Sequence, residues 1–386
     1  MAQNSYIGVS GKARTIKAIN VGVAGKARKV VNGYIGVAGK ARPFFSLAKG
    51  IKFYQTVDPL NAAASTPEAA SIGDYGLFAG GSTSTQVTSY NGSLQKGTPT
   101  ALSTNKRYHS GQGNSGYAMF AGGGSASGGW TVYDTIEGYS SSLQKSSATL
   151  RNPRYSLASA CTGNYTYAVF AGGYLSGSIT STDVDSYNAS MQRFGTPALT
   201  TAVSDFAGGN VGVYAIFAGG YLSGGEVSTQ VTAYNNSLQK STPTPLSVGR
   251  ALPAAANIIN TTDAKRYTLF AGGNDGSSKK TLIEAYSDSL QRTILTTGLE
   301  TAQSGLVGTS CRGYEGETAV YQAVFAGDLL NTVTIINSSL QRLTPSAISS
   351  SLRPGLAATW VPYSTREYAL LGGGNNTAVV DAFTYF

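Results

Sequence analysis

The stretch YAVFAGG, residues 167–173, decides the fold, because close copies of it return along the chain. The copies are YGLFAGG (75–81), YAMFAGG (117–123), YAIFAGG (214–220), YTLFAGG (267–273) and the weaker QAVFAGD (322–328) and YALLGGG (368–374). Alternating residues that end at a glycine pair are typical of a β-strand running into a tight turn. The seven aligned apolar residues stand 42 to 55 residues apart: Phe78, Phe120, Phe170, Phe217, Phe270, Phe325 and Leu371.

Each repeat can be divided into four strands. A variable loop follows the glycine pair, then an alternating strand such as VTAY (231–234), a turn containing SLQ, and a connection to a small-residue strand such as RYSLASA (154–160). Seven copies with a period near 50 residues predict an all-β, seven-bladed propeller over residues 51–386. The segment IKFYQ (51–55) precedes the first repeat, so we expect residues 51–56 to complete the last blade and close the ring.

Residues 1–50 have a different character and predict a separate basic arm. A 14-residue unit occurs three times, as YIGVSGKART from Tyr6, NVGVAGKARK from Asn20 and YIGVAGKARP from Tyr34. This arm holds nine of the 28 Lys and Arg residues and none of the 19 Asp and Glu residues, so the rest of the chain is neutral. Each unit can form a short hairpin that gains order by adding strands to a partner. The candidate docking residues are Lys12, Arg14, Lys26, Arg28, Lys40 and Arg42.

Two kinds of partner remain open for the arm. Its charge density would also suit nucleic acid. Few aromatic residues are present for base stacking, and the cations recur at fixed places in a patterned unit. We therefore expect a protein partner, with nucleic acid as the alternative.

The residue inventory argues against an enzyme, a metal site or a cofactor. His109 is the only histidine, and Cys161 and Cys311, the only cysteines, are expected to be separate buried thiols. Glu137, Asp183, Asp185 and Glu284 lie on corresponding strands of different repeats, and we interpret them as solvated strand faces rather than a catalytic pair. The start of the chain lacks the apolar core of a secretory signal, and no run of about 18 apolar residues predicts membrane insertion.

Recognition is expected in the loops after the glycine pairs, because variable loops on a rigid scaffold carry most binding sites. Three consecutive repeats place large apolar groups there: Trp130 and Tyr133, Tyr174 and Leu175, and Tyr221 and Leu222. Exposed aromatics suit stacking on sugar rings or anchoring a protein, so the expected ligand is a host-surface glycan or protein. The alternative is that these side chains pack on neighbouring loops.

A second set of basic residues follows the SLQ turns. Its members are Lys96, Lys145, Arg193, Lys240, Arg292 and Arg342. Lysines on an exposed strand edge discourage aggregation, and a docking belt around the rim is the alternative.

Residues 51–386 resemble kelch propellers. The likeness lies in the strand that ends at two glycines, the alternating strand after it, and an arginine at the start of the inner strand, assigned here to Arg107, Arg154, Arg250 and Arg353. Leu or Met stands in the fourth strand where kelch repeats usually carry Trp. The resemblance implies the fold and leaves the function open, because propellers serve as enzymes, scaffolds and adhesins.

The GVxGKAR units, with GKAR at 11–14, 25–28 and 39–42, resemble N-terminal segments of phage and prophage structural proteins of Gram-positive hosts. This implies a virion protein assembled in the host cytoplasm and docked to a tail or baseplate through residues 1–50, where a homo-oligomer is compatible with the assembly. A receptor-binding or fibre component is expected. The alternatives are a head decoration protein, a bacterial carbohydrate-binding or scaffold propeller, and a nucleic-acid-associated protein.

Overall fold

The chain divides into two compact units, residues 1–49 and Gly50–Tyr385. The computed structural model describes residues 50–126, 129–260, 265–315, 318–327, 331–343, 346–349, 353–362 and 367–386, together with the backbone of six strands before residue 50.

The N-terminal unit contains three antiparallel hairpins. They are β1 (Tyr6–Val9) with β2 (Lys12–Thr15), β3 (Ile19–Val23) with β4 (Lys26–Val30), and β5 (Asn32–Val37) with β6 (Lys40–Ser46). The repeat sets their register, because Val9, Val23 and Val37 each lie opposite the first lysine of the following strand. The side chains of Lys12, Arg14, Lys26, Arg28, Lys40 and Arg42 lie outside what the structure describes.

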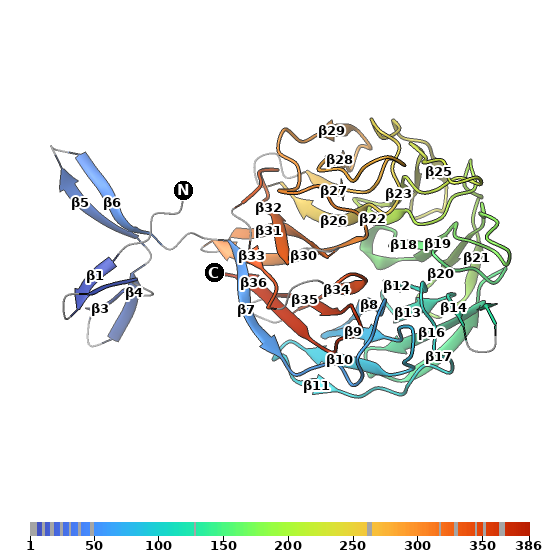
Figure 1. Ribbon diagram of the computed structural model, residues 1–386, viewed down its shortest axis with the longest axis horizontal. Coiled ribbons are helices and arrows are strands. Elements are labelled where there is room, and N and C mark those ends of the chain that lie inside the picture. The colour runs from blue at the N-terminus through green and yellow to red at the C-terminus, as the bar shows by residue number, and fades with distance from the viewer. Residues whose placement is uncertain are drawn as a thin grey trace. The chain divides into compact units, whose positions relative to one another are not determined.

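The second unit confirms the predicted all-β, seven-bladed propeller. Seven four-stranded antiparallel sheets, built by the described residues from Ile51 onward, surround a common centre (Figure 1). From the innermost strand outward, blade 1 is β8 (Glu68–Ile72), β9 (Tyr75–Ala79), β10 (Val87–Asn91) and β11 (Lys96–Gly97); blade 2 is β12 (Ser110–Gly113), β13 (Tyr117–Ala121), β16 (Thr135–Ser140) and β17 (Lys145–Thr149). Blade 3 is β18 (Ala158–Cys161), β19 (Ala168–Ala171), β20 (Val184–Tyr187) and β21 (Arg193–Gly195); blade 4 is β22 (Ala207–Val211), β23 (Tyr214–Ala218), β24 (Val231–Tyr234) and β25 (Lys240–Ser241).

The remaining blades follow the same order, and the last one closes the ring. Blade 5 is β26 (Ala254–Ile259), β27 (Arg266–Ala271), β28 (Ile283–Ser287) and β29 (Arg292–Ile294); blade 6 is β30 (Leu306–Glu315), β31 (Thr318–Gly327), β32 (Thr332–Ile336) and β33 (Ser346–Ala347). Blade 7 combines β34 (Leu356–Val361), β35 (Tyr368–Gly373) and β36 (Val380–Tyr385) with β7 (Ile51–Val57). Because β7 pairs with β36, segments from both ends of the ring share one sheet.

Other regular structure is sparse. A small hairpin, β14 (Gly124–Ser125) with β15 (Thr131–Val132), lies in a loop of blade 2. Within the described residues, the only helical segment is the three-residue 3-10 turn η1 (Gly163–Tyr165). None of the described helical structure is long and apolar enough to cross a membrane.

The hydrophobic core is divided among the interfaces between blades. The described residues form seven clusters, and each joins one blade to the next, including blade 7 to blade 1. Within blade 2, Phe120 meets Tyr139 edge to face at 6.1 Å between ring centroids. The Tyr139 hydroxyl then donates to the Thr100 carbonyl in the preceding linker at 2.7 Å. The repeated Phe and Tyr therefore fill a core and tie each blade to its neighbour.

Five of the six cations after the SLQ turns also bond to the preceding linker, whereas Arg193 lies 3.8 Å from Asp185. Lys96 donates to the Pro59 carbonyl at 3.0 Å, and Lys145 donates to the Ala101 carbonyl at 2.7 Å. Lys240, Arg292 and Arg342 repeat the arrangement. These bonds indicate that the cations hold the outer strands in place, which favours a structural role rather than a docking role.

Two sequence interpretations are wrong: the solvated acids in blades 2, 3 and 5, and the linker cation in blade 2. The acids Glu137, Asp185 and Glu284 are buried, not solvated. Among the described residues, four buried pairs join a linker cation to a third-strand carboxylate: Lys106–Glu137 at 3.4 Å, Arg250–Glu284 at 2.6 Å, Arg154–Asp185 and Arg353–Asp381. Lys106 therefore occupies the position assigned to Arg107.

Candidate binding surface

The loops after the glycine pairs lie beside the linkers that lead into the inner strands. Backbone bridges join Arg107 to Gly124 in blade 2, Tyr155 to Tyr174 in blade 3, and Ser204 to Tyr221 in blade 4. Gly124, Tyr174 and Tyr221 therefore occupy equivalent positions at one end of three consecutive blades.

Trp130 supplies the aromatic ring that blade 2 lacks at this position. It follows β14 in a longer loop, and its ring lies over Gly124. A Cβ added at Gly124 would come within 2.6 Å of the Trp130 ring. The glycine is therefore required for the ring to lie there.

Five side chains form a continuous surface that we call the aromatic ridge: Arg107, Tyr108, Trp130, Tyr155 and Tyr174. The ring centroids of Tyr108 and Trp130 lie 6.3 Å apart, those of Trp130 and Tyr155 5.1 Å, and those of Tyr155 and Tyr174 5.2 Å. These separations lie within the range of favourable aromatic pairs. Tyr108 and Trp130 are each 40% exposed. The ridge therefore offers stacking area to a ligand while its rings hold one another in place.

Arg107 places a positive charge at one end of the ridge. Its guanidinium carbon lies 5.3 Å from the Tyr108 ring centroid and 5.2 Å from that of Trp130, which is cation–π distance. Within the described residues it takes part in no salt bridge, and its buried Nε has no hydrogen-bond partner. The charge is therefore held by stacking and is available to a ligand.

The opposite end of the ridge is made of hydroxyl groups and one carboxyl group. Tyr174 lies beside Ser204 and Asp205, and the Ser204 hydroxyl donates to Asp205 at 3.2 Å. Burial raises the pKa of Asp205 above its usual range, and burial also raises the pKa of the Tyr174 phenol. The ridge thus runs from a cationic end to a hydroxyl-rich end.

The backbone beneath the ridge is pinned by hydrogen bonds between successive linkers. The Ser156 amide donates to the Tyr108 carbonyl at 2.8 Å, and the Asp205 amide donates to the Ser156 carbonyl at 3.1 Å. All three residues have positive φ, between 50° and 56°, which side-chain-bearing residues adopt at a cost. A conformation held this way provides a rigid base for the ridge.

The other predicted loop residues have different roles. Tyr133 and Leu175 are partly buried, and their backbones close turns with Gly123 and Ile179. Leu222 packs against the core between blades 3 and 4, as the packing alternative expected. Tyr221 is partly buried, and its backbone pairs with Ser204.

Sequence reasoning missed Arg107, Tyr108 and Tyr155 as site residues. They lie in the linkers before the inner strands and not in the variable loops after the glycine pairs. The available signal was the dipeptide Arg-Tyr before an inner strand, at 107–108 and 154–155; its third occurrence, at 266–267, lies in β27.

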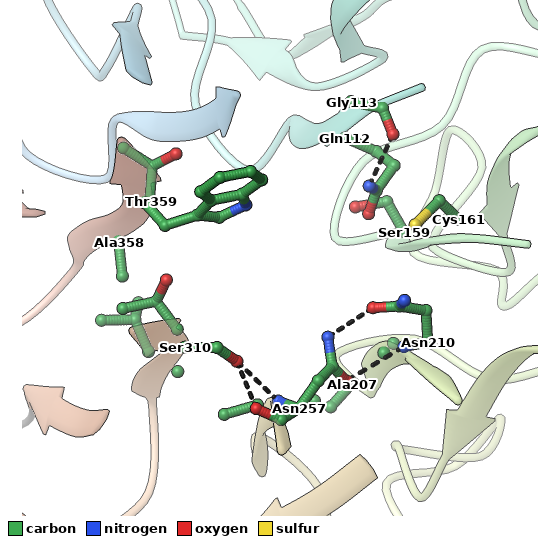
Figure 2. Close-up of a pocket in the computed structure, with 18 of the residues that line it drawn as sticks. Gln112, Gly113, Ser159, Cys161, Ala207, Asn210, Asn257, Ser310, Ala358 and Thr359 are labelled. Carbon is green, nitrogen blue, oxygen red and sulfur yellow. Dashed lines mark hydrogen bonds between the residues drawn. The ribbon is translucent and has the colours of Figure 1, made fainter. Parts of the chain in front are cut away.

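The centre of the ring contains a cavity of about 700 Å³ lined by the inner strands. Many of its polar groups already bond to one another. Figure 2 shows Asn210, Asn257 and Ser310 linked in this way. The backbone N–H of Asn257 donates to the Ser310 hydroxyl at 2.9 Å, and the backbone N–H of Asn210 donates to the Asn257 side-chain oxygen at 3.2 Å. These bonds join the inner strands of blades 4, 5 and 6. Among the charged groups lining the cavity, Glu68 has its pKa raised to about 8 by burial.

Comparison with known proteins supports the fold. No protein-family model matches the chain, and no curated protein sequence matches it. Among solved structures, the chain is similar to that described as "Structure of YjhT", with a TM-score of 0.53 and 13% identity, over 72% of this chain and 99% of that one. At this identity the likeness establishes a shared fold and carries no information about ligand or activity.

Proposed function

We propose that the chain is a non-enzymatic receptor-binding component of a phage or phage-derived particle. Residues 1–50 dock it to a tail or baseplate, and the propeller contacts a host-surface glycan or protein through the aromatic ridge. The resemblance of the three GVxGKAR units to phage structural proteins supports the location, as does the concentration of excess charge in this arm.

The ridge is the observation that carries the proposed binding role. Large aromatic side chains on a rigid base bind with little loss of conformational entropy, which is why Tyr and Trp are frequent at binding hot spots. Trp130 and Tyr108 meet this description, because both are stacked and both remain 40% exposed.

The three strand carboxylates that the sequence singles out and the one histidine of the sequence are unsuited to acid–base catalysis. The carboxylates of Glu137, Asp185 and Glu284 form ion pairs with buried linker cations. Burial next to Lys106 lowers the pKa of His109 to about 3, so this imidazole is neutral at physiological pH and has little basicity. General acid–base chemistry needs a group whose pKa lies near the working pH.

Sedimentation with purified cell walls from a panel of Gram-positive bacteria tests the proposal. The wild-type chain should sediment with the walls of at least one strain, and Trp130→Ala should reduce the bound fraction at least fivefold. Tyr314→Ala is the matched control, since Tyr314 is 41% exposed and stacks with Arg312 at 5.5 Å. Failure to bind any wall, or equal losses in the two variants, contradicts the proposal.

A bacterial scaffold or carbohydrate-binding propeller is the second candidate, because the same ridge would serve it. The arm separates the two functions. Recovery of the chain with tail or baseplate proteins favours the phage assignment, whereas recovery with host proteins or duplex DNA favours the alternatives.

A further inference from the structure

We propose that the aromatic ridge recognises a linear acidic glycan, which lies along Trp130, Tyr155 and Tyr174 and places an anionic group against Arg107. This inference rests on the proposed function, in which the ridge is the receptor-binding surface, and it names the chemistry of the receptor.

The length of the ridge argues for a chain of sugars over a single terminal sugar. Trp130, Tyr155 and Tyr174 follow one another at 5.1 and 5.2 Å, so three rings extend along blades 2 and 3. The rings are not coplanar, since the angle between Trp130 and Tyr155 is 76° and that between Tyr155 and Tyr174 is 32°. A ligand along them would meet ring faces and edges in turn, as successive rotated units of an oligosaccharide can.

The charge distribution gives the ligand a direction. Arg107 is a permanent cation with no ion-pair partner among the described residues, and stacking on Tyr108 and Trp130 limits its rotamer freedom. At the opposite end, the partly exposed Tyr174 and Asp205 supply a hydroxyl and a carboxyl group suited to neutral sugar hydroxyls. A carboxylate or phosphate on the ligand would therefore lie at the Arg107 end, where it gains a charge-assisted hydrogen bond.

Other cations of the described propeller show why Arg107 is distinctive. Lys106, the adjacent residue, is fully buried and bound to Glu137. Arg312, which also stacks on an aromatic ring, is neutralised by Glu367 at 2.9 Å. Arg107 combines an exposed aromatic neighbour with an unneutralised charge, which is the combination that an anionic sugar requires.

Tryptophan fluorescence tests the inference in the full chain. The chain has two tryptophans, Trp130 and Trp360, so Trp360→Phe leaves the ridge residue as the only one. The probes are oligogalacturonates of one to six units, the same oligomers with methyl-esterified carboxyls, chito-oligosaccharides, and a ribitol-phosphate teichoic acid. Esterification removes the charge of the oligogalacturonate and leaves its sugar backbone unchanged. The teichoic acid distinguishes recognition of phosphate from recognition of carboxylate. Isothermal titration calorimetry on the wild-type chain gives the same comparison if Trp360→Phe disturbs folding.

We expect at least one acidic oligomer of three or more units to quench Trp130, with monomers inactive and the uncharged counterpart binding about tenfold more weakly. Arg107→Gln should remove this preference, Arg107→Lys should restore much of it, and Tyr314→Ala should leave it unchanged. Equal binding of charged and uncharged oligomers, an unaltered preference in Arg107→Gln, or no binding by any acidic probe overturns the inference. If the acidic-glycan inference fails but Trp130→Ala reduces cell-wall binding as expected, the proposed function stands with a different receptor. If Trp130→Ala leaves cell-wall binding unchanged, the inference and the proposed function both fail.

Discussion

Replacing a buried ion pair with the residues that another blade uses tests how the propeller is held together. Blade 5 joins Arg250 to Glu284 at 2.6 Å, and both side chains have no exposed surface. At the equivalent positions of blade 4, Val203 precedes the inner strand and Thr232 stands in the third strand; both are buried. The variants are Arg250→Val, Glu284→Thr and the double substitution.

The expected free-energy changes follow from burial. Each single substitution leaves a buried charge without its main partner, although Glu284 keeps Arg292 at 3.7 Å, and should destabilise the fold by about 3–5 kcal/mol. The double substitution leaves no stranded charge, but it loses the bond from the Ser247 amide to Glu284 at 2.9 Å and leaves space where the arginine was. Its cost should be about 1–2 kcal/mol, well below the sum of the single losses.

Urea unfolding followed by tryptophan fluorescence measures the three changes in one double-mutant cycle. A coupling energy of at least about 3 kcal/mol is expected. If the double substitution costs as much as the two single ones together, the pair is not an interchangeable unit, and the reasoning about all four buried pairs fails.

Further predictions concern pH, the ridge and the arm. Because the pKa of Glu68 is raised from 4.5 to about 8, its contribution to stability is lost progressively as the pH rises through this range. Raising the pH from 6.5 to 8.5 should cost up to about 2 kcal/mol, less where channel water solvates the carboxylate, and Glu68→Gln should abolish this loss in urea unfolding. The pKa of His109 is lowered to about 3, so in the Glu68→Gln background stability should fall by about 2 kcal/mol between pH 7 and 5, and His109→Gln should flatten that slope. Gly124→Ala should displace the Trp130 ring, seen as a red-shifted emission maximum in Trp360→Phe, and an unchanged spectrum would contradict the packing described. Replacing all six candidate docking cations of the arm with Gln should abolish copurification with particles, and retention would refute charge-dependent docking.

The fold could be predicted from the sequence because its signal is repeated. Seven copies of one strand with a regular period leave few architectures, and each aligned apolar residue from Phe78 to Leu371 is buried in the structure. A single error in one copy does not change such a prediction.

The buried pairs and the ridge were harder to predict because they depend on contacts between distant segments. Lys106 and Arg107 are adjacent basic residues, and only the backbone geometry determines which one turns inward. Glu284 looked solvated because its partner, Arg250, stands 34 residues earlier. Trp130 could be named as a binding residue, but its place over Gly124 and beside Tyr155 depends on how a longer loop folds back.

Adsorption of particles to host cells tests the central claim most directly. Particles carrying the Trp130→Ala chain should assemble with the normal amount of this protein and adsorb at least tenfold more slowly, whereas particles carrying Tyr314→Ala should adsorb normally. Unchanged adsorption of the Trp130→Ala particles, or absence of the chain from purified particles, would contradict the account.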